Sequence, residues 1–240
     1  MKVHKPIILH IPALLVQELN KYLEANQPCF KYDIVYFYYI IHYIIVQQIK
    51  NKNNIEYCLN VPINMKNFKA ITVSNINDYI KLLINGEFIK SDNQYVKGER
   101  SKGYWINEIY LLGVDKIEVK SDCRLFKKII KYQRRKKTHI DRLEPYLKRM
   151  NIELMNIDFD YDNAEKWILS QPDEQKRTTY IISLNQLKDK RFRYFKRNKT
   201  NNRLDTNITN LKKDLKQFII GEYVCIDLKN SQPFFFKYVN

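Results

Sequence analysis

The sequence predicts an α+β fold, and three observations lead to this prediction. Apolar residues recur at helical spacing in several segments, for example at Leu15, Leu19 and Leu23. Short apolar or alternating runs, such as 57–61 and 104–106, are typical of strands. Hydrophobic residues make up 45% of the 240 residues and aromatic residues 13%, which is enough to build a core, so wholesale disorder is not expected.

Two helices are expected in the first 50 residues. The first covers residues 12–23, and Pro28 separates it from a strongly apolar second helix over about 32–49. The most apolar part, Ile34 to Val46, is 13 residues long, whereas a helix needs about 20 to cross a bilayer. We therefore interpret this segment as a buried core helix and expect no membrane partner.

A third helix is expected between Ser74 and Gly86. Ser74 is a good N-terminal cap, and Gly86 stands where many helices end in a left-handed residue. The apolar side chains expected on its buried face are Ile76, Ile80, Leu83 and Ile84.

A hairpin is predicted directly after this helix. Strand-like runs at 88–90 and 104–106 flank a basic loop with a glycine at each end, 97–103 (KGERSKG). A helix that ends in glycine and precedes a hairpin with a basic tip resembles a winged helix-turn-helix, over residues 72–107. In that family a helix enters the major groove and the wing contacts phosphates. The alternative is an α+β domain with an ordinary hairpin. The resemblance implies phosphate contacts by Lys97, Arg100 and Lys102.

The charge balance indicates a polyanionic partner. Lysine and arginine number 42 and aspartate and glutamate 26, which gives a net charge of +16 and favours nucleic acid over a membrane surface. With five glycines, the chain contains no glycine-rich dinucleotide or P-loop motif. Its four cysteines form no C-x-x-C pair, which excludes a zinc ribbon and is typical of a reducing, cytoplasmic location.

Residues 119–170 are interpreted as a basic helical connector. A helix expected after Asp122 has an apolar stripe of Leu125, Phe126, Ile129 and Ile130, and it ends in the cationic run 134–137 (RRKK). Arg134 and Arg135 either contact phosphates or form a solvated helix end that suits the helix dipole.

A second helix is expected near the end of this connector. Asp162 with Glu165 predicts a capping box for it. We favour this over a calcium loop, because an EF-hand needs a glycine and a glutamate where this chain has Asn163 and Leu169.

The segment 188–203 alternates cations with aromatic residues. This combination is typical of surfaces that follow a nucleic-acid backbone and stack its bases, and the alternative is a solvated helix face. The candidate phosphate-binding residues here and just beyond are Arg191, Arg193, Lys196, Arg197, Arg203 and Lys216.

The C-terminal pattern adds a candidate metal ligand. An amphipathic helix is expected over 211–219, and the apolar strand 223–226 then leads into Asp227. A carboxylate that follows a buried strand near cations suits Mg²⁺ bound to a triphosphate. The alternative is an aspartate that caps the next turn.

Residues 203–232 resemble the region that leads into palm motif A of family A DNA polymerases and single-subunit RNA polymerases. The resemblance implies that Asp227 binds catalytic Mg²⁺, that the Leu228 carbonyl assists, and that Arg203 is the upstream arginine. The segment also resembles strings in uncharacterised proteins of AT-rich phages and mobile elements. The segments that carry the resemblance are Arg203-Leu204-x-Thr206, Asn210-Leu211, Lys216-Gln217-Phe218-Ile219, Asp227 and Ser231-Gln232.

The printed sequence stops 13 residues after Asp227, before any second acidic hairpin or lysine-bearing fingers helix. We therefore expect the N-terminal part, or a degenerate relative, of a polymerase-like enzyme. Such a chain would be a nucleotidyltransferase only when completed by downstream sequence or a partner. Three regions are expected: a winged-helix-like domain (1–118), the connector (119–170), and a mainly helical segment that opens a palm-like sheet (171–240).

The expected function is that of a nucleic-acid-binding replication or transcription protein of a phage or mobile element, in the host cytoplasm. DNA or RNA is the expected partner, with a nucleoside triphosphate in the polymerase case. Two alternatives remain: a non-catalytic DNA-binding initiator or adaptor with a winged helix, and a structural phage protein that lines packaged DNA.

Overall fold

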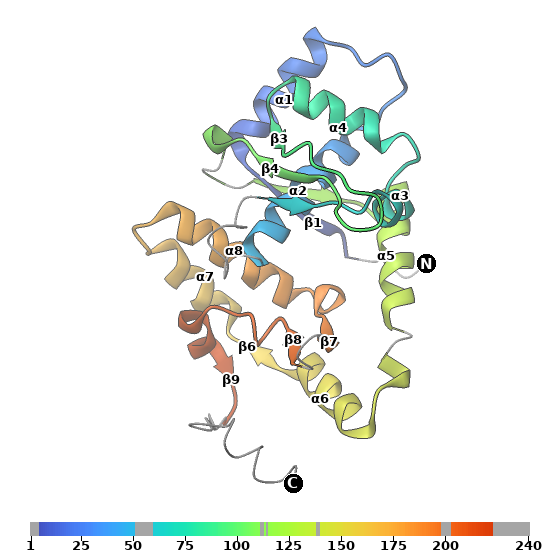
Figure 1. Ribbon diagram of the computed structural model, residues 1–240. Helices are drawn as coiled ribbons and strands as arrows, with labels where there is room; N and C mark the ends of the chain where they lie inside the picture. The colour runs from blue at the N-terminus through green and yellow to red at the C-terminus, as the bar shows by residue number, and fades with distance from the viewer. Residues whose placement is uncertain are drawn as a thin grey trace.

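The chain folds as an α+β protein, as the sequence predicts. The structure is a computed structural model that describes residues 5–50, 60–110, 113, 115–137, 140–197 and 203–222 (Figure 1). Within these residues, helices surround small antiparallel sheets of two or three strands.

The N-terminal strand pairs with a strand from much later in the chain. β1 (Ile7–Ile11) runs antiparallel to β5 (Asp115–Val119), with Ile7 opposite Val119. Every residue of β1 except Ile8 is buried. A strand covered on both faces has a continuous apolar sequence rather than an alternating one, so the sequence pattern does not reveal this strand.

Two helices follow β1 and pack in the interior. α1 (Ala13–Ala25) buries Leu15, Leu19 and Leu23, which lie one turn apart on the same face. α2 (Ile34–Lys50) contacts β1 and α4, and it buries one side chain after another along its length. The predicted core helix is therefore confirmed. In the described part of the chain, no helix is both long enough and apolar enough to cross a membrane.

The next segment builds a three-stranded sheet from three separated pieces of chain. The strand order is β2–β4–β3, with both pairings antiparallel, so the returning strand β4 lies in the middle. We call β3, β4 and the loop between them (residues 89–106) the first hairpin. The elements of this segment are β2 (Val61–Pro62), α3 (Met65–Ile71), α4 (Ile76–Asn85), β3 (Ile89–Ser91), β4 (Gly103–Ile106) and the 3₁₀ helix η2 (Glu108–Tyr110).

α5 (Arg124–Lys137) closes the N-terminal part of the molecule. It packs against α3, and its predicted apolar stripe is confirmed because Leu125, Phe126 and Ile129 are buried in the same core as α2. The domain boundary expected between residues 118 and 119 falls within β5, and β5 and α5 on its two sides contribute to one core.

The C-terminal half is built from short elements around α8. Its strands form two small antiparallel pairs, β6 with β9 and β7 with β8. We call residues 195–206 the second hairpin; its strands are described, but not residues 198–202. The elements are η3 (Ile140–Arg142), α6 (Pro145–Asn156), β6 (Asp158–Phe159), α7 (Tyr161–Leu169), α8 (Glu174–Lys188), η4 (Lys190–Phe192), β7 (Phe195–Arg197), β8 (Leu204–Thr206), η5 (Lys213–Phe218) and β9 (Ile219–Ile220).

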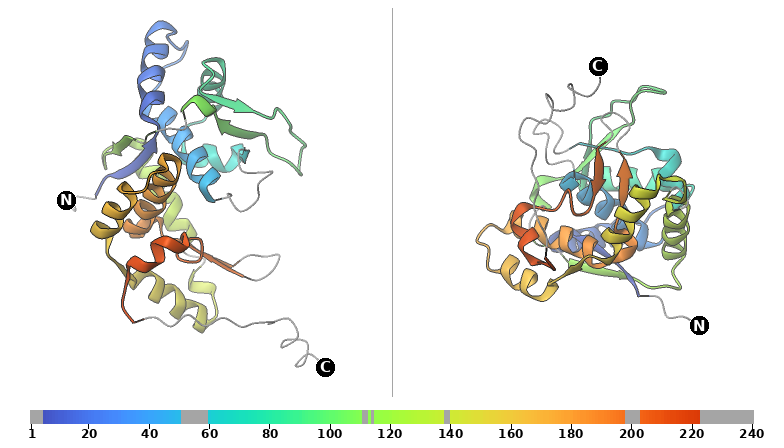
Figure 2. Two further views of the ribbon diagram at one scale, coloured as in Figure 1. Left: turned by 90° about the vertical axis from the view of Figure 1, so that its left-hand side faces the viewer. Right: turned by 90° about the horizontal axis from the view of Figure 1, so that it is seen from below.

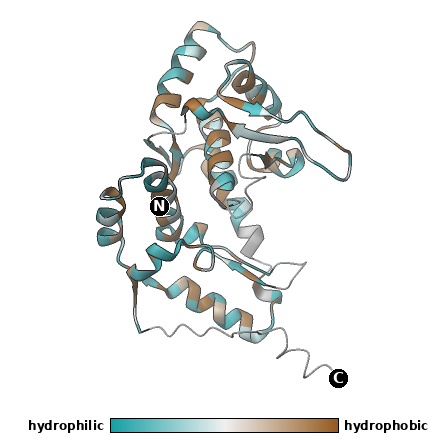
Figure 3. Cartoon of the chain, turned by 60° about the vertical axis from the view of Figure 1, so that its left-hand side comes forward, coloured by the Kyte–Doolittle hydropathy of each residue, from teal (hydrophilic) through white to brown (hydrophobic). Residues whose placement is uncertain are grey.

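Two hydrophobic cores result, one in each half. The first joins side chains of β1, α1 to α5 and the three-stranded sheet, and the second joins side chains of α7, α8 and η5. In Figure 3, hydrophobic residues gather where the helices face one another in the interior. Ile182 of α8 belongs to the first core, so α8 contributes to both.

Polar contacts fix the junction between the halves. The Arg191 guanidinium donates to the carbonyl oxygens of Lys5 (2.7 Å) and Pro6 (2.8 Å) just before β1. On β1 itself, the His10 Nε2 atom lies 3.0 Å from the amide nitrogen of Asn185 on α8. These bonds, together with Ile182, hold the second half against β1.

The ends of α4 differ from the sequence expectation. Asn75, not Ser74, is the N-terminal capping position, and no side chain caps the helix there. Gly86 has an ordinary φ of −83°, and the left-handed residue is Glu87, with φ 57°. Position 86 has no room for a larger residue, because a Cβ atom there would lie 2.4 Å from the Phe88 ring.

Two further local predictions are corrected in the C-terminal half. The side chain of Asp160, not Asp162, caps α7 by accepting a hydrogen bond from the Asn163 amide (3.1 Å). The amphipathic helix expected over 211–219 is a six-residue 3₁₀ helix followed by β9. The second difference follows from strand pairing. β9 pairs with β6, and this pairing requires an extended chain at Ile219.

Candidate nucleic-acid interface

α4 presents a polar face opposite its buried side. Ile76, Ile80 and Leu83 point into the first core, whereas Asn77 and Lys81 are exposed. Lys81 lies 3.9 Å from Asp78 one turn earlier, an exposed pair that contributes little to stability. The exposed face of α4 can therefore offer amide and ammonium groups to a ligand.

Asp92 organises the loop of the first hairpin. One carboxylate oxygen accepts hydrogen bonds from the amides of Gln94 (3.0 Å) and Gly103 (2.9 Å). The other accepts from the Asn60 side chain (2.8 Å) and from Arg100 (3.1 Å). Desolvation acts to raise the pKa of Asp92, but these hydrogen bonds and the Arg100 charge outweigh it, and the pKa is lowered. The ionised carboxylate thus ties both ends of the loop together.

The tip of the first hairpin is a tight turn. Val96 and Arg100 exchange two backbone hydrogen bonds, and Gly98 between them has φ 88°, a left-handed conformation that glycine adopts easily. The side chains of Tyr95 and Val96 are exposed by 62% and 47%. The tip therefore carries apolar groups beside its cations.

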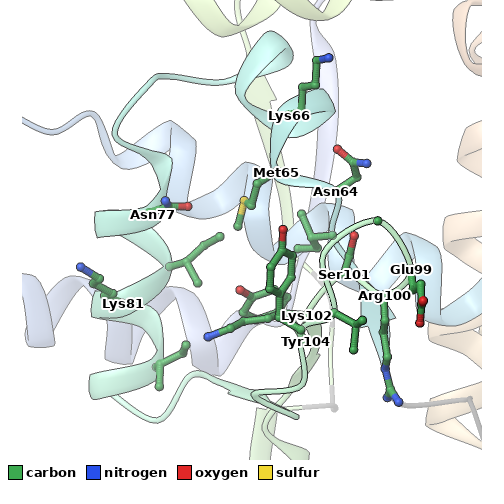
Figure 4. Close-up of a pocket in the computed structure, with 16 residues that line it drawn as sticks. Asn64, Met65, Lys66, Asn77, Lys81, Glu99, Arg100, Ser101, Lys102 and Tyr104 are labelled. Carbon is green, nitrogen blue, oxygen red and sulfur yellow. The ribbon is translucent and has the colours of Figure 1, made fainter.

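A groove of about 690 Å³ lies between α4, the start of α3 and the first hairpin (Figure 4). Its apolar lining includes Ile80, Ile84 and the buried Tyr104. Four cationic side chains and one anionic side chain line it: Lys66, Lys81, Arg100, Lys102 and Glu99.

The cations of this groove are available to different degrees. Arg100 is held by Asp92 at 3.1 Å. Among the described residues, neither Lys66 nor Lys102 has an acidic side chain within 4.0 Å, and both are exposed. A concave surface with excess positive charge and exposed amides can accept phosphates and base edges.

Of the sequence-predicted residues in this region, two line the groove and one does not. Arg100 and Lys102 line it, and Lys97 is exposed at the tip. Sequence reasoning missed Lys66 and the organising role of Asp92. Lys66 lies in the first turn of α3, which the Asn64 side chain caps, and no sequence motif marks this lysine as a binding residue.

The structure corrects the phosphate-binding prediction for Arg193. Its side chain is 5% exposed, and its guanidinium donates to the carbonyl oxygens of Leu187 (2.9 Å) and Leu154 (2.8 Å). Further bonds go to the Met155 and Ile157 carbonyls and to the Tyr161 hydroxyl. Because these acceptors occupy the guanidinium, Arg193 fastens the base of the second hairpin to α6, α7 and α8 instead of facing solvent.

Arg191, another predicted phosphate-binding residue, is half-buried and makes most of its hydrogen bonds within the protein. Its guanidinium binds the Asp189 carboxylate through two nitrogens, at 2.6 Å and 2.9 Å, and also the two carbonyls before β1. It lies over the Phe126 ring, 5.7 Å from the ring centre. Arg191 therefore joins the two halves, and four of its five N–H groups are already bonded within the protein.

The remaining predicted phosphate-binding residues of the C-terminal half are exposed. Lys196, Arg197 and Arg203 are exposed on or beside the second hairpin, and Lys216 is exposed on η5. Arg197 pairs with Glu144 at 3.2 Å, and both side chains of this pair are largely exposed.

Several predicted residues cannot be placed. Arg134 and Arg135 lie in the last turn of α5, but their side chains are not among those described. Asp227 and Leu228, the predicted Mg²⁺ ligands, lie outside the described residues. Within the described ranges, no cluster of three or more His, Cys, Asp or Glu side chains could hold a metal ion.

Comparisons with protein-family models, with curated proteins and with solved structures found no match. We therefore infer function from the geometry and charge of the chain itself.

Proposed function

We propose that this chain binds duplex DNA through a winged helix formed by α2 to β4. The support is its order of elements: a helix, two short helices and a hairpin, with β2 added beside the returning strand β4. This arrangement resembles a winged helix-turn-helix, in which α4 would enter the major groove and the first hairpin would be the wing.

The groove between α4 and the first hairpin carries the proposal. Duplex DNA presents closely spaced phosphates on either side of base edges, so its binding site needs cations beside neutral hydrogen-bonding groups. Lys66 and Lys102 would neutralise phosphates, and Asn77 on α4 would face base edges. An amide side chain can bind adenine through two hydrogen bonds.

The groove also has the rigidity that binding requires. Asp92 fixes both ends of the hairpin loop, and α4 is anchored by its buried face. A preorganised surface loses less conformational entropy on binding than a flexible one.

This function is compatible with both roles expected from the sequence. One is a non-catalytic initiator or adaptor of a phage or mobile element. The other is the nucleic-acid-binding part of a polymerase-like enzyme, in which Asp227 would hold Mg²⁺. No described residue favours the second role over the first, so we propose DNA binding as the shared activity.

Salt-dependent binding tests the proposal. We would titrate the full chain into a fluorescently labelled duplex of about two helical turns, between about 50 and 200 mM salt. The groove variant Lys66→Ala/Lys81→Ala/Lys102→Ala removes three cations. The control variant Lys21→Ala/Lys176→Ala removes exposed lysines that pair with acids on their own helices, α1 and α8.

We expect the groove variant to bind at least about tenfold more weakly than wild type. The slope of log affinity against log salt should fall by about 0.9 for each lost phosphate contact. Groove and control variants with equal affinity would contradict the proposal, as would wild-type affinity that does not change with salt.

A further inference from the structure

We propose that the second hairpin extends this DNA-binding surface and contacts the phosphates of the same duplex that occupies the groove. This inference rests on the proposed function. It assigns a binding role to the two exposed cations of β7, Lys196 and Arg197, which belong to the other half of the molecule.

The direction of the two hairpins is the first observation. Both views in Figure 2 show the first hairpin and the pair β7–β8 extending toward the same side of the molecule. A long, regularly charged ligand that lies along this side can meet both. Duplex DNA is such a ligand, because its phosphates repeat along the whole helix.

The charge of the second hairpin is the second observation. Lys196 lies opposite Asp205 and Arg197 lies opposite Leu204 in the β7–β8 register. Successive residues of a strand point to opposite faces, so the two cations lie on both faces of the hairpin. Arg197 is paired with the exposed Glu144, and exposed pairs of this kind contribute little to stability. Replacing that carboxylate by a phosphate therefore has a small cost.

The base of the second hairpin is fixed. The Asn207 side chain accepts a hydrogen bond from the Tyr194 amide (2.6 Å), and the Asn210 side chain donates to the Tyr194 hydroxyl (2.6 Å). Arg193, two residues before the hairpin, is fastened to carbonyls of α8 and α6 and to that of Ile157 directly after α6. The described strands β7 and β8 therefore start from a fixed base.

The junction holds the two hairpins in a constant relation. Arg191 and Asn185 bond to residues at or before β1, and Ile182 is buried in the first core. Two phosphate-binding surfaces held in this way bind one duplex together, because the second contact forms without a further loss of translational freedom.

Binding and stoichiometry of the full chain test this inference. The hairpin variant Lys196→Ala/Arg197→Ala is compared with the groove variant and the control variant, on the same labelled duplex of about two turns. Matching unfolding curves for all variants would show that each is folded.

We expect the hairpin variant to bind about tenfold more weakly than the control, with a salt slope reduced by about two contacts. One duplex should bind per chain. If the hairpin variant matches the control while the groove variant is weakened, the inference is wrong and the proposed function stands. Two duplexes per chain would likewise overturn it. If wild type binds no duplex, the proposed function fails as well.

Discussion

The two halves of the molecule are stabilised in different ways. In the N-terminal half, apolar side chains from strands and helices converge on one large core, in which α2 contributes buried residues along most of its length. In the C-terminal half the core is much smaller, and buried polar groups such as Arg193 and Asn207 bind its short elements together. The difference indicates that the second half depends more on a few hydrogen-bonding side chains.

The second half also contains a turn, residues 206–209, that is closed by hydrogen bonds of its own side chains. Thr206 accepts hydrogen bonds from the amides of Ile208 (3.2 Å) and Thr209 (3.0 Å), and the Thr209 hydroxyl accepts from the Thr206 amide (2.8 Å). The Thr-Asn-Ile-Thr pattern therefore closes its own turn. Part of the pattern that resembles the polymerases thus has a local structural role in this chain.

The largest predicted effect comes from Arg193→Ala. It leaves several buried carbonyls without a donor and should reduce the free energy of unfolding by about 3 kcal/mol or more. The chain has one tryptophan in each half, Trp105 on β4 and Trp167 on α7. In a Trp105→Phe background, urea unfolding followed by Trp167 fluorescence measures the effect on the second half.

Two control variants test whether the loss of stability is specific to the buried guanidinium of Arg193. Arg193→Lys should not restore stability, because an ammonium group cannot reach the same set of acceptors. Arg197→Ala, an exposed position, should change stability by less than about 0.5 kcal/mol. Equal effects of Arg193→Ala and Arg197→Ala would contradict the role given to Arg193.

The second prediction concerns pH and the junction. Burial, and then the nearby Lys116 charge, lower the pKa of His10 from 6.5 to about 4. The unfolded chain therefore binds a proton between these values while the folded chain does not. Stability should be complete above about pH 6.5 and decrease toward pH 4, by roughly 3 kcal/mol in total.

Urea unfolding at a series of pH values measures this dependence. His10→Gln removes the titrating group and should flatten the curve between about pH 4 and 6.5. A His10→Gln variant with the same pH dependence as wild type would show that another group is responsible.

The third prediction concerns the first hairpin. Asp92→Ala removes the acceptor for two loop amides and should lower stability by about 1–2 kcal/mol. It should also weaken duplex binding, although Asp92 is itself an anion, because the loop loses its fixed shape. Binding that strengthens in Asp92→Ala would indicate that charge alone, and not loop geometry, governs the interaction.

The smallest predicted effect distinguishes two aspartates at the start of α7. Asp160→Ala should lower the free energy of unfolding slightly, because its side chain caps the helix, whereas Asp162→Ala should have less effect. Thermal unfolding of the two variants measures this directly. The reverse order would support the capping box expected from the sequence.

Much of the first half could be predicted from the sequence, because apolar residues at helical spacing mark the helices whose buried faces form its core. The core helix at 34–46, the stripe on α5 and the helix–hairpin succession are examples. β1 was missed because it is buried on both faces and lacks alternation. Its partner β5 lies far along the chain, and local patterns do not show such pairing.

The candidate site was predicted in part. Arg100 and Lys102 belong to a basic loop that the sequence makes evident, and both line the groove. Arg191 and Arg193 have the same local composition as Lys196 and Arg197, yet the first two are bound inside the protein and the last two are exposed. Only the tertiary contacts distinguish a structural arginine from an available one.

Hydrogen–deuterium exchange of the full chain, with and without a duplex of about two turns, tests the central claim most directly. The account predicts that the duplex slows amide exchange in α4 and in the loop of the first hairpin, but leaves α1 unchanged. A duplex that binds without slowing exchange in either α4 or that loop would contradict it.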